Sequence, residues 1–300
     1  DGNDDRGIDV GIMTRKDYPI QHIASHVDDA DAKGIIFSRD CPEYVIQTPV
    51  GNKLLVLING AYGQRAKRIC QIAARAHAVL ETPEDTPPDI AKLDAALKAD
   101  KAITHVFVVH CETTSGILNP VAELAGVVKR HGRRLLIDSM SAFGALPIDA
   151  RETGFDALAS SSNKCLEGIP GFGFVVCDRA ALEKSAGNAH ALSLDLYDQW
   201  QALEKTGQYR FTPPIHAIVA LHQAIDEFIA EGGVAGRGQR HRDNCKTLID
   251  GMRALGFETL LADRLQAPII VTFRMPRDPK FHFQTFYDRL KDRGYVIYPG

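Results

Sequence analysis

In this chain of 300 residues, short apolar runs alternate with helical patterns between residues 54 and 178. The runs are apolar on both faces, and the stretches between them carry apolar residues at spacings of three and four. Such runs joined by helices predict an α/β fold with a mostly parallel sheet that helices cover on both sides. The predicted strands are 54–59, 76–81, 105–110, 135–139, 156–162 and 171–177.

Two of these strands need separate treatment. Residues 156–162 and 171–177 are joined too tightly for a crossover helix, so the second of them is predicted to be antiparallel. The strand at 54–59 has two interpretations. It is either the second arm of a β-hairpin with residues 43–48 or the first strand of the parallel sheet. One strand cannot easily do both in a compact fold, and the sequence leaves the choice open.

The pattern changes after residue 178. It is helical to about residue 255, and then predicts strands at 256–261 and 267–275, a helix within 281–294 and a strand at 295–300. This order is typical of a small α+β domain of which the final elements are missing.

Bulk composition excludes several classes of function. A net charge of -3 gives no basic excess for binding nucleic acid. No apolar run approaches the roughly 20 residues that span a bilayer, and the first residues lack the pattern of a signal peptide. The six cysteines are scattered without a CxxC pair, which favours reduced thiols over a disulfide framework or a metal site. We therefore expect a cytoplasmic protein with no metal site.

Two charged residues follow neighbouring predicted strands. Asp138 closes the run LLIDS, and Lys164 follows DALASSSN. If both strands are parallel neighbours, both side chains emerge at the carboxyl edge of the sheet, where open α/β sheets bind ligands. A lysine amine and a carboxylate there match the needs of pyridoxal phosphate, and an ordinary ion pair at the strand ends is the alternative.

Several stretches of the chain have the character of family motifs. They include NGAYGQRAKRI (59–69), HCETTSGILNP (110–120), LLIDSMSAFGALPID (135–149), SSNKCLEGIPG (161–171), YRFTPPIH (209–216) and EGGVAGRGQRH (231–241). On these stretches, residues 54–300 resemble the 2-aminoethylphosphonate:pyruvate aminotransferases, within the class V pyridoxal-phosphate enzymes. The resemblance implies a three-layer large domain of the aspartate aminotransferase type (fold type I) over residues 54–240, with its N-terminal part missing. A partial small domain over 241–300 and a homodimer are also implied.

The resemblance implies a role for four residues. Lys164 resembles the lysine that binds the cofactor covalently and moves the substrate proton, and Asp138 resembles the partner of the pyridine nitrogen. Thr113 matches a hydroxyl that contacts the cofactor ring oxygen, with a plain polar turn as the alternative. Thr212 resembles a residue that reaches the cofactor phosphate of the neighbouring subunit, with helix capping as the alternative. Ser162 and Asn163 are expected only to shape the turn around the lysine.

The implied reaction moves an amino group from 2-aminoethylphosphonate to pyruvate and gives phosphonoacetaldehyde and alanine. Exchange between serine or alanine and glyoxylate is the nearest competitor. Both anionic substrates need cationic anchors, for which Arg210 is a candidate and a surface charge is the alternative.

The sequence departs from the family at both ends. Nothing before residue 54 resembles the TPGP-like stretch or the QGSGS-type phosphate loop, and the FRIG-like arginine that would follow residue 300 is absent. Residues 1–53 instead resemble a fragment of the endonuclease/exonuclease/phosphatase superfamily without its metal ligands. The sequence thus predicts a chimera with impaired turnover. The alternatives are a noncatalytic remnant and a metal-dependent phosphodiesterase or nuclease.

Overall fold

The computed structural model describes residues 30–31, 34–35 and 52–298, which belong to two compact units, 1–41 and 42–300. In the first unit, β1 (Ala30–Asp31) pairs antiparallel with β2 (Gly34–Ile35). The predicted nuclease-like segment 1–53 lies almost wholly outside the described residues.

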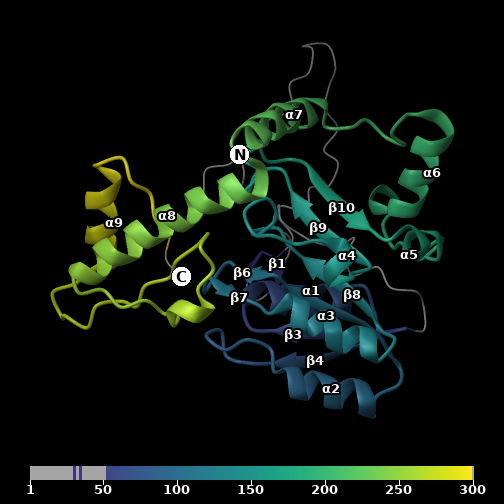
Figure 1. Cartoon of the computed structure of the whole chain (residues 1–300), viewed down its shortest axis with the longest axis horizontal. Helices are drawn as coiled ribbons and strands as arrows, with labels where there is room; N and C mark the ends of the chain where they lie inside the picture. The colour runs from purple at the N-terminus through teal and green to yellow at the C-terminus, as the bar shows by residue number, and fades with distance from the viewer. Residues whose placement is uncertain (1–29, 32–33, 36–51, 299–300) are drawn as a thin grey trace. The chain divides into compact units, whose positions relative to one another are not determined.

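The second unit contains a six-stranded sheet in the order β10-β9-β8-β5-β3-β4 (Figure 1). All its pairings are parallel except that between β9 and β10, as the sequence predicts. The predicted α/β class is therefore confirmed. The strands are β3 (Lys53–Ile58), β4 (His77–Glu81), β5 (Ile103–Val109), β8 (Arg134–Asp138), β9 (Ala157–Ser161) and β10 (Gly173–Cys177).

The structure decides between the two interpretations of β3. This strand lies inside the sheet, with β4 parallel on one edge and β5 parallel on the other. Because both hydrogen-bonding edges of β3 are occupied, it cannot also form a hairpin with residues 43–48. The hairpin interpretation is wrong, and residues 43–48 themselves lie outside the described residues.

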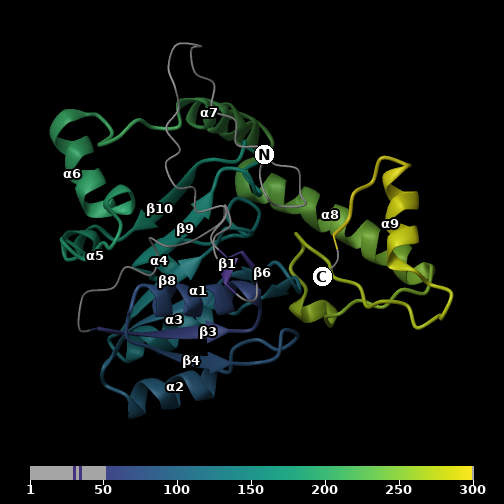
Figure 2. The ribbon, with the colours of Figure 1, turned by 180° about the vertical axis from the view of Figure 1, so that it is seen from behind.

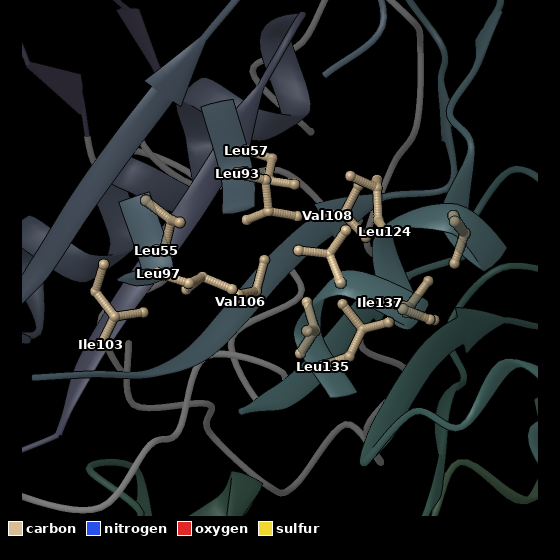
Figure 3. Packing of buried hydrophobic residues seen from close by; sticks show 14 of the residues in the cluster. Leu55, Leu57, Leu93, Leu97, Ile103, Val106, Val108, Leu124, Leu135 and Ile137 are labelled. Atoms are coloured by element: carbon tan, nitrogen blue, oxygen red, sulfur yellow. The ribbon is translucent and has the colours of Figure 1, made fainter. Parts of the chain in front are cut away.

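Alternate residues of the central strands pack into a core with two helices (Figure 3). Leu55 and Leu57 of β3 lie in the same cluster as Leu93 of α2 (Ile90–Ala99) and Leu124 of α3 (Val121–Arg130). The intervening residues of β3 are equally buried, and α1 (Ala61–Ile72) approaches the Cα of Ile58 through Gly63. Burial on both faces is the reason why these strands read as continuous apolar runs.

Short elements connect the main ones. The hairpin β6 (Cys111–Glu112) and β7 (Ile117–Leu118) follows β5, and α4 (Ala150–Thr153) precedes β9. After β10 the chain is helical, as predicted, through α5 (Arg179–Glu183), α6 (Leu196–Thr206), α7 (Ile215–Ala230) and α8 (Gly233–Ala254). Figure 2 shows α8 as one continuous helix. Residue 240, where the sequence divides the large domain from the small one, lies inside α8, and this division stays a prediction.

The predicted C-terminal strands are wrong in this structure. Residues 256–275 form only isolated antiparallel bridges, Thr259 with Phe273 and Gln266 with Ile117, and residues 295–298 are not in a strand. Two backbone hydrogen bonds of 2.8 Å join the segments, from the Leu260 N–H to the Thr272 carbonyl and from the Arg274 N–H to the Glu258 carbonyl, and no longer ladder forms. The apolar residues pack instead as an aromatic cluster, in which Phe257 contacts Phe273 and Phe286 of α9 (Phe283–Lys291). The predicted helix is confirmed.

Within the described residues, no helix is long and apolar enough to cross a membrane.

Candidate active site

The candidate site lies at the carboxyl edge of the parallel strands. From β3 the chain adds β4 on one side and then β5, β8 and β9 on the other, so the direction of strand addition reverses between β3 and β5. Such a switch point is where open α/β sheets bind ligands. The loops that leave β5, β8 and β9 at this edge carry the residues that the sequence singles out.

Asp138 is the last residue of β8 and is only 2% exposed. Its carboxylate accepts a hydrogen bond from the Met140 N–H at 2.9 Å, and its backbone carbonyl accepts one from His110 at 2.7 Å. Its partner across the ladder is Ala159 of β9. The carboxylate is therefore held rigidly at the edge of the sheet, beside the strand that leads to the lysine.

Lys164 lies in the loop between β9 and β10, three residues after the end of β9, and is half-buried. Asp138 and Lys164 thus follow neighbouring parallel strands at the same edge, which is the arrangement that the sequence predicts. The Lys164 carbonyl accepts a hydrogen bond from the Glu167 N–H at 2.8 Å. The Ser162 hydroxyl donates to the Ile169 carbonyl at 2.6 Å, so Ser162 shapes the loop.

Thr113 connects the loops at this edge. Its Oγ1 lies 2.6 Å from the hydroxyl oxygen of Ser141, which follows β8 by three residues. The thiol of Cys165 donates to the Ser141 carbonyl at 3.2 Å. Ser141 therefore joins the loop of Thr113 to the loop of Lys164. Sequence reasoning missed Ser141, because nothing in the local pattern shows which loops meet.

Thr212 is placed differently. It is exposed and lies two residues before the N-cap of α7, which is Pro214. No side chain caps this helix, so the helix-capping alternative for Thr212 is wrong. Among the described contacts, Thr212 does not join the group of Thr113, Ser141 and Cys165. Arg210 forms an ion pair with Asp198 at 3.2 Å and donates a hydrogen bond to the Leu192 carbonyl. Both terminal nitrogens of its guanidinium therefore have partners within this chain.

Two buried ionisable residues, neither of them predicted from the sequence to have a role, flank the site. Burial lowers the pKa of His110 to about 4, and its Nδ1 lies 3.1 Å from the Ser139 hydroxyl. Burial also raises the pKa of Glu112 to about 7, although the backbone N–H groups of Tyr62 and Gly63 donate to its carboxylate and oppose this rise. Glu112 therefore caps the start of α1. In the sequence, the only indication of His110 and Glu112 is that both polar residues closely follow an apolar predicted strand.

A second group of charges holds the lysine loop from outside the sheet. Arg237 of α8 is 2% exposed and donates to the Cys165 carbonyl at 2.7 Å. Glu167 has φ 62, a left-handed conformation that costs a residue other than glycine roughly 1–2 kcal/mol. Its carboxylate accepts from Arg240 at 2.8 Å. These contacts are between residues about 70 positions apart and could not be read from the sequence.

A cavity of about 360 Å³ lies at the opposite edge of the sheet. Its lining includes Thr104 at the start of β5, Arg134 at the start of β8 and Asp156 just before β9. Arg134 and Asp156 neutralise each other in an ion pair of 2.6 Å. This cavity is therefore separate from the edge that carries Asp138 and Lys164.

Comparison with known proteins identifies the family. The sequence profile of the class-V aminotransferases matches residues 51–295. A protein of Pseudomonas putida named 2-aminoethylphosphonate--pyruvate transaminase is 55% identical over 252 residues, which are 84% of this chain and 68% of the relative. A protein of the same name from Pseudomonas fluorescens is 48% identical over 286 residues, 93% of this chain and 78% of the relative.

A solved structure supports the fold. The pyridoxamine-pyruvate aminotransferase from Mesorhizobium loti superposes with a TM-score of 0.78 at 24% identity, covering 87% of this chain and 67% of that one. At this identity the likeness concerns the fold alone, and it confirms the predicted fold type I. With the match to residues 51–295 and the identity to the Pseudomonas relatives, the chain belongs to the class-V aminotransferase family.

Proposed function

We propose that this chain catalyses amino-group transfer between 2-aminoethylphosphonate and pyruvate with pyridoxal phosphate as cofactor. The observation that carries the proposal is the position of Asp138 and Lys164 after neighbouring parallel strands, in a chain 55% identical to a relative named for this reaction. Exchange with glyoxylate is the nearest competing reaction, and the names of these relatives favour pyruvate.

The residues present fit the proposed cofactor. Pyridoxal phosphate needs an amine for covalent attachment and an acid beside its ring nitrogen, and both groups are present at this edge. The hydroxyl of Ser161, at the end of β9, is buried and has no hydrogen-bond partner among the described residues. A buried hydroxyl without a partner is costly, so a polar ligand at this edge would stabilise it.

Each residue then has a defined task. The bound cofactor supplies an electron sink for the carbon that loses its proton. The Lys164 Nζ would hold the cofactor and move the proton of the substrate carbon. The Asp138 carboxylate, which accepts a hydrogen bond from the Met140 N–H, would keep the ring nitrogen protonated. The Thr113 hydroxyl, which lies against the Ser141 hydroxyl, would contact the ring oxygen.

The proposal includes an assembly and a location. We expect a homodimer in which Thr212, which is exposed two residues before the N-cap of α7, reaches the cofactor phosphate of the partner. Its hydroxyl and the backbone of a helix start are suitable donors for a phosphate. A cytoplasmic location stays a prediction.

Borohydride reduction tests the proposal directly. The full chain is incubated with pyridoxal phosphate, reduced and digested, and the modified peptide is identified by mass spectrometry. We expect modification at residue 164 in the wild type and none there in Lys164→Ala. Alanine formation from 2-aminoethylphosphonate and pyruvate, and the parallel assay with glyoxylate, then decide the substrate pair.

Asp138→Asn is the matched variant for this experiment. It preserves the shape of the side chain, so we expect modification of Lys164 to persist while amino exchange slows by about a hundredfold or more. A wild-type chain that is not modified at Lys164 would instead favour the noncatalytic remnant. Phosphodiester cleavage that needs a metal and survives in Lys164→Ala would favour the nuclease-like alternative.

A further inference from the structure

Arg237 is the largest side chain in the fully buried set of the described residues, and its guanidinium has specific partners. Its Nη1 donates to the Cys165 carbonyl at 2.7 Å and lies 3.4 Å from the Glu167 carboxylate. Its Nε donates to the Glu231 carboxylate, and the guanidinium lies over the Phe228 ring. One side chain on α8 therefore contacts two points of the lysine loop and the end of α7.

Arg237 binds the backbone of the residue that follows the lysine. The Cys165 carbonyl belongs to the residue that directly follows Lys164, so the hydrogen bond from Arg237 fixes the backbone one residue beyond the lysine. The planar fork of a guanidinium can bond a carbonyl and a carboxylate at once in a set geometry, which a lysine ammonium cannot. Arg237 is therefore suited to hold this backbone in one orientation.

A second arginine completes the contact. Arg240, one turn further along α8, bonds the Glu167 carboxylate at 2.8 Å and the Glu231 carboxylate at 2.6 Å. Glu167 itself holds the unusual φ of 62, and its N–H closes the turn on the Lys164 carbonyl at 2.8 Å. A strained residue persists where surrounding contacts over-determine it, and here the two arginines supply those contacts.

We propose that Arg237 is a positioning residue for Lys164. It acts through the Cys165 carbonyl and Glu167 to hold the lysine amine at the angle required for covalent attachment, and it does not itself touch the reacting atoms. This role rests on the proposed function, because it assigns Lys164 the task of binding the cofactor. It adds α8, which lies outside the parallel sheet, to the machinery of the site.

Two readouts test the role. The first is the rate at which borohydride fixes pyridoxal phosphate to Lys164, measured well below the unfolding temperature and normalised to folded protein. The second is amide hydrogen exchange of residues 162–172 without cofactor. For Arg237→Met we expect the fixation rate to fall at least about tenfold, since small misplacements of a reacting group are costly. We also expect faster exchange of the Glu167 and Gly168 amides.

Three further variants keep the test decisive. Arg237→Lys retains the charge but not the fork, so its fixation rate should lie between those of wild type and Arg237→Met. Glu167→Gln removes the loop-side charge from a half-exposed position and should show the same two effects, more weakly, even if Arg237→Met does not fold. Arg242→Met is the control, because the side chain of this exposed arginine of α8 hydrogen-bonds only Gln239 among the described residues, and both readouts should be unchanged.

The outcomes separate the two proposals. Wild type that is not modified at Lys164 overturns the proposed function and, with it, the role of Arg237. Wild type that is modified, with variants that unfold at lower temperature yet react and exchange at the wild-type rates, overturns only the role of Arg237. Slower fixation with faster exchange in Arg237→Met or Glu167→Gln supports it.

Discussion

At the scale of single residues, burial controls the charge of Glu112. Its carboxylate is fully buried and lies so close to the helix start that a Cβ on Gly60 would come within 2.6 Å of it. Burial raises its pKa from 4.5 to about 7, so between these pH values the folded protein binds one proton more than the unfolded chain. Stability must therefore decrease as the pH rises through this window.

This linkage gives a prediction for Glu112→Gln. A shift of this size corresponds to a contribution of about 3 kcal/mol that is present below pH 4.5 and lost by about pH 7. We expect the variant to lose this pH dependence, so that its stability relative to wild type improves as the pH rises from 4.5 to 7. Urea unfolding at several pH values measures it, with the exposed Glu123→Gln as the control. Equal slopes for wild type and Glu112→Gln would contradict the assignment.

At the scale of elements, α8 packs against the loop after β8 through a glycine. A Cβ on Gly238 would come within 2.4 Å of the Ala145 carbonyl oxygen, which is backbone and cannot move freely. Gly251, on the same helix, has nothing within 4 Å of the corresponding position. The two glycines therefore serve different purposes, since only the first permits the close approach of α8.

The pair Gly238→Ala and Gly251→Ala tests this contact. We expect Gly238→Ala to destabilise the protein by roughly 1–3 kcal/mol, because the added methyl forces α8 away from the loop. Gly251→Ala should stabilise it by about 0.5–1 kcal/mol, since alanine is the better helix former. Thermal and urea unfolding measure both variants. Similar effects of the two substitutions would show that Gly238 is not a packing contact.

At the scale of the whole molecule, the proposed dimer predicts complementation between subunits. If Thr212 serves the partner's site, a hybrid of Lys164→Ala and Thr212→Ala subunits contains one site with both residues intact. We expect each variant alone to have little amino exchange and the refolded mixture to regain up to about a quarter of the wild-type rate, by random pairing of subunits. Light scattering checks that the chain is a dimer, and a mixture no more active than its components would refute a shared site.

Local sequence patterns are enough to predict the strands of the sheet, the antiparallel β10 and the edge on which Asp138 and Lys164 lie. Apolar periodicity and connection length are local properties, and they carry this information directly. The same local signal misled at residues 256–275, where apolar residues pack as an aromatic cluster with α9. A short apolar run predicts that a segment is buried, but it does not predict which other segment packs against it.

The contacts between distant segments cannot be predicted in this way. Folding places β3 between β4 and β5, joins Thr113 to Ser141, and buries Arg237 against the loop of Lys164. Each of these depends on which of many possible partners lies opposite, and that choice is made by the packing of the whole unit rather than by the residues nearby. The strands and the shared sheet edge of Asp138 and Lys164 can therefore be predicted from the sequence, whereas the contacts that hold the lysine loop in place arise only on folding.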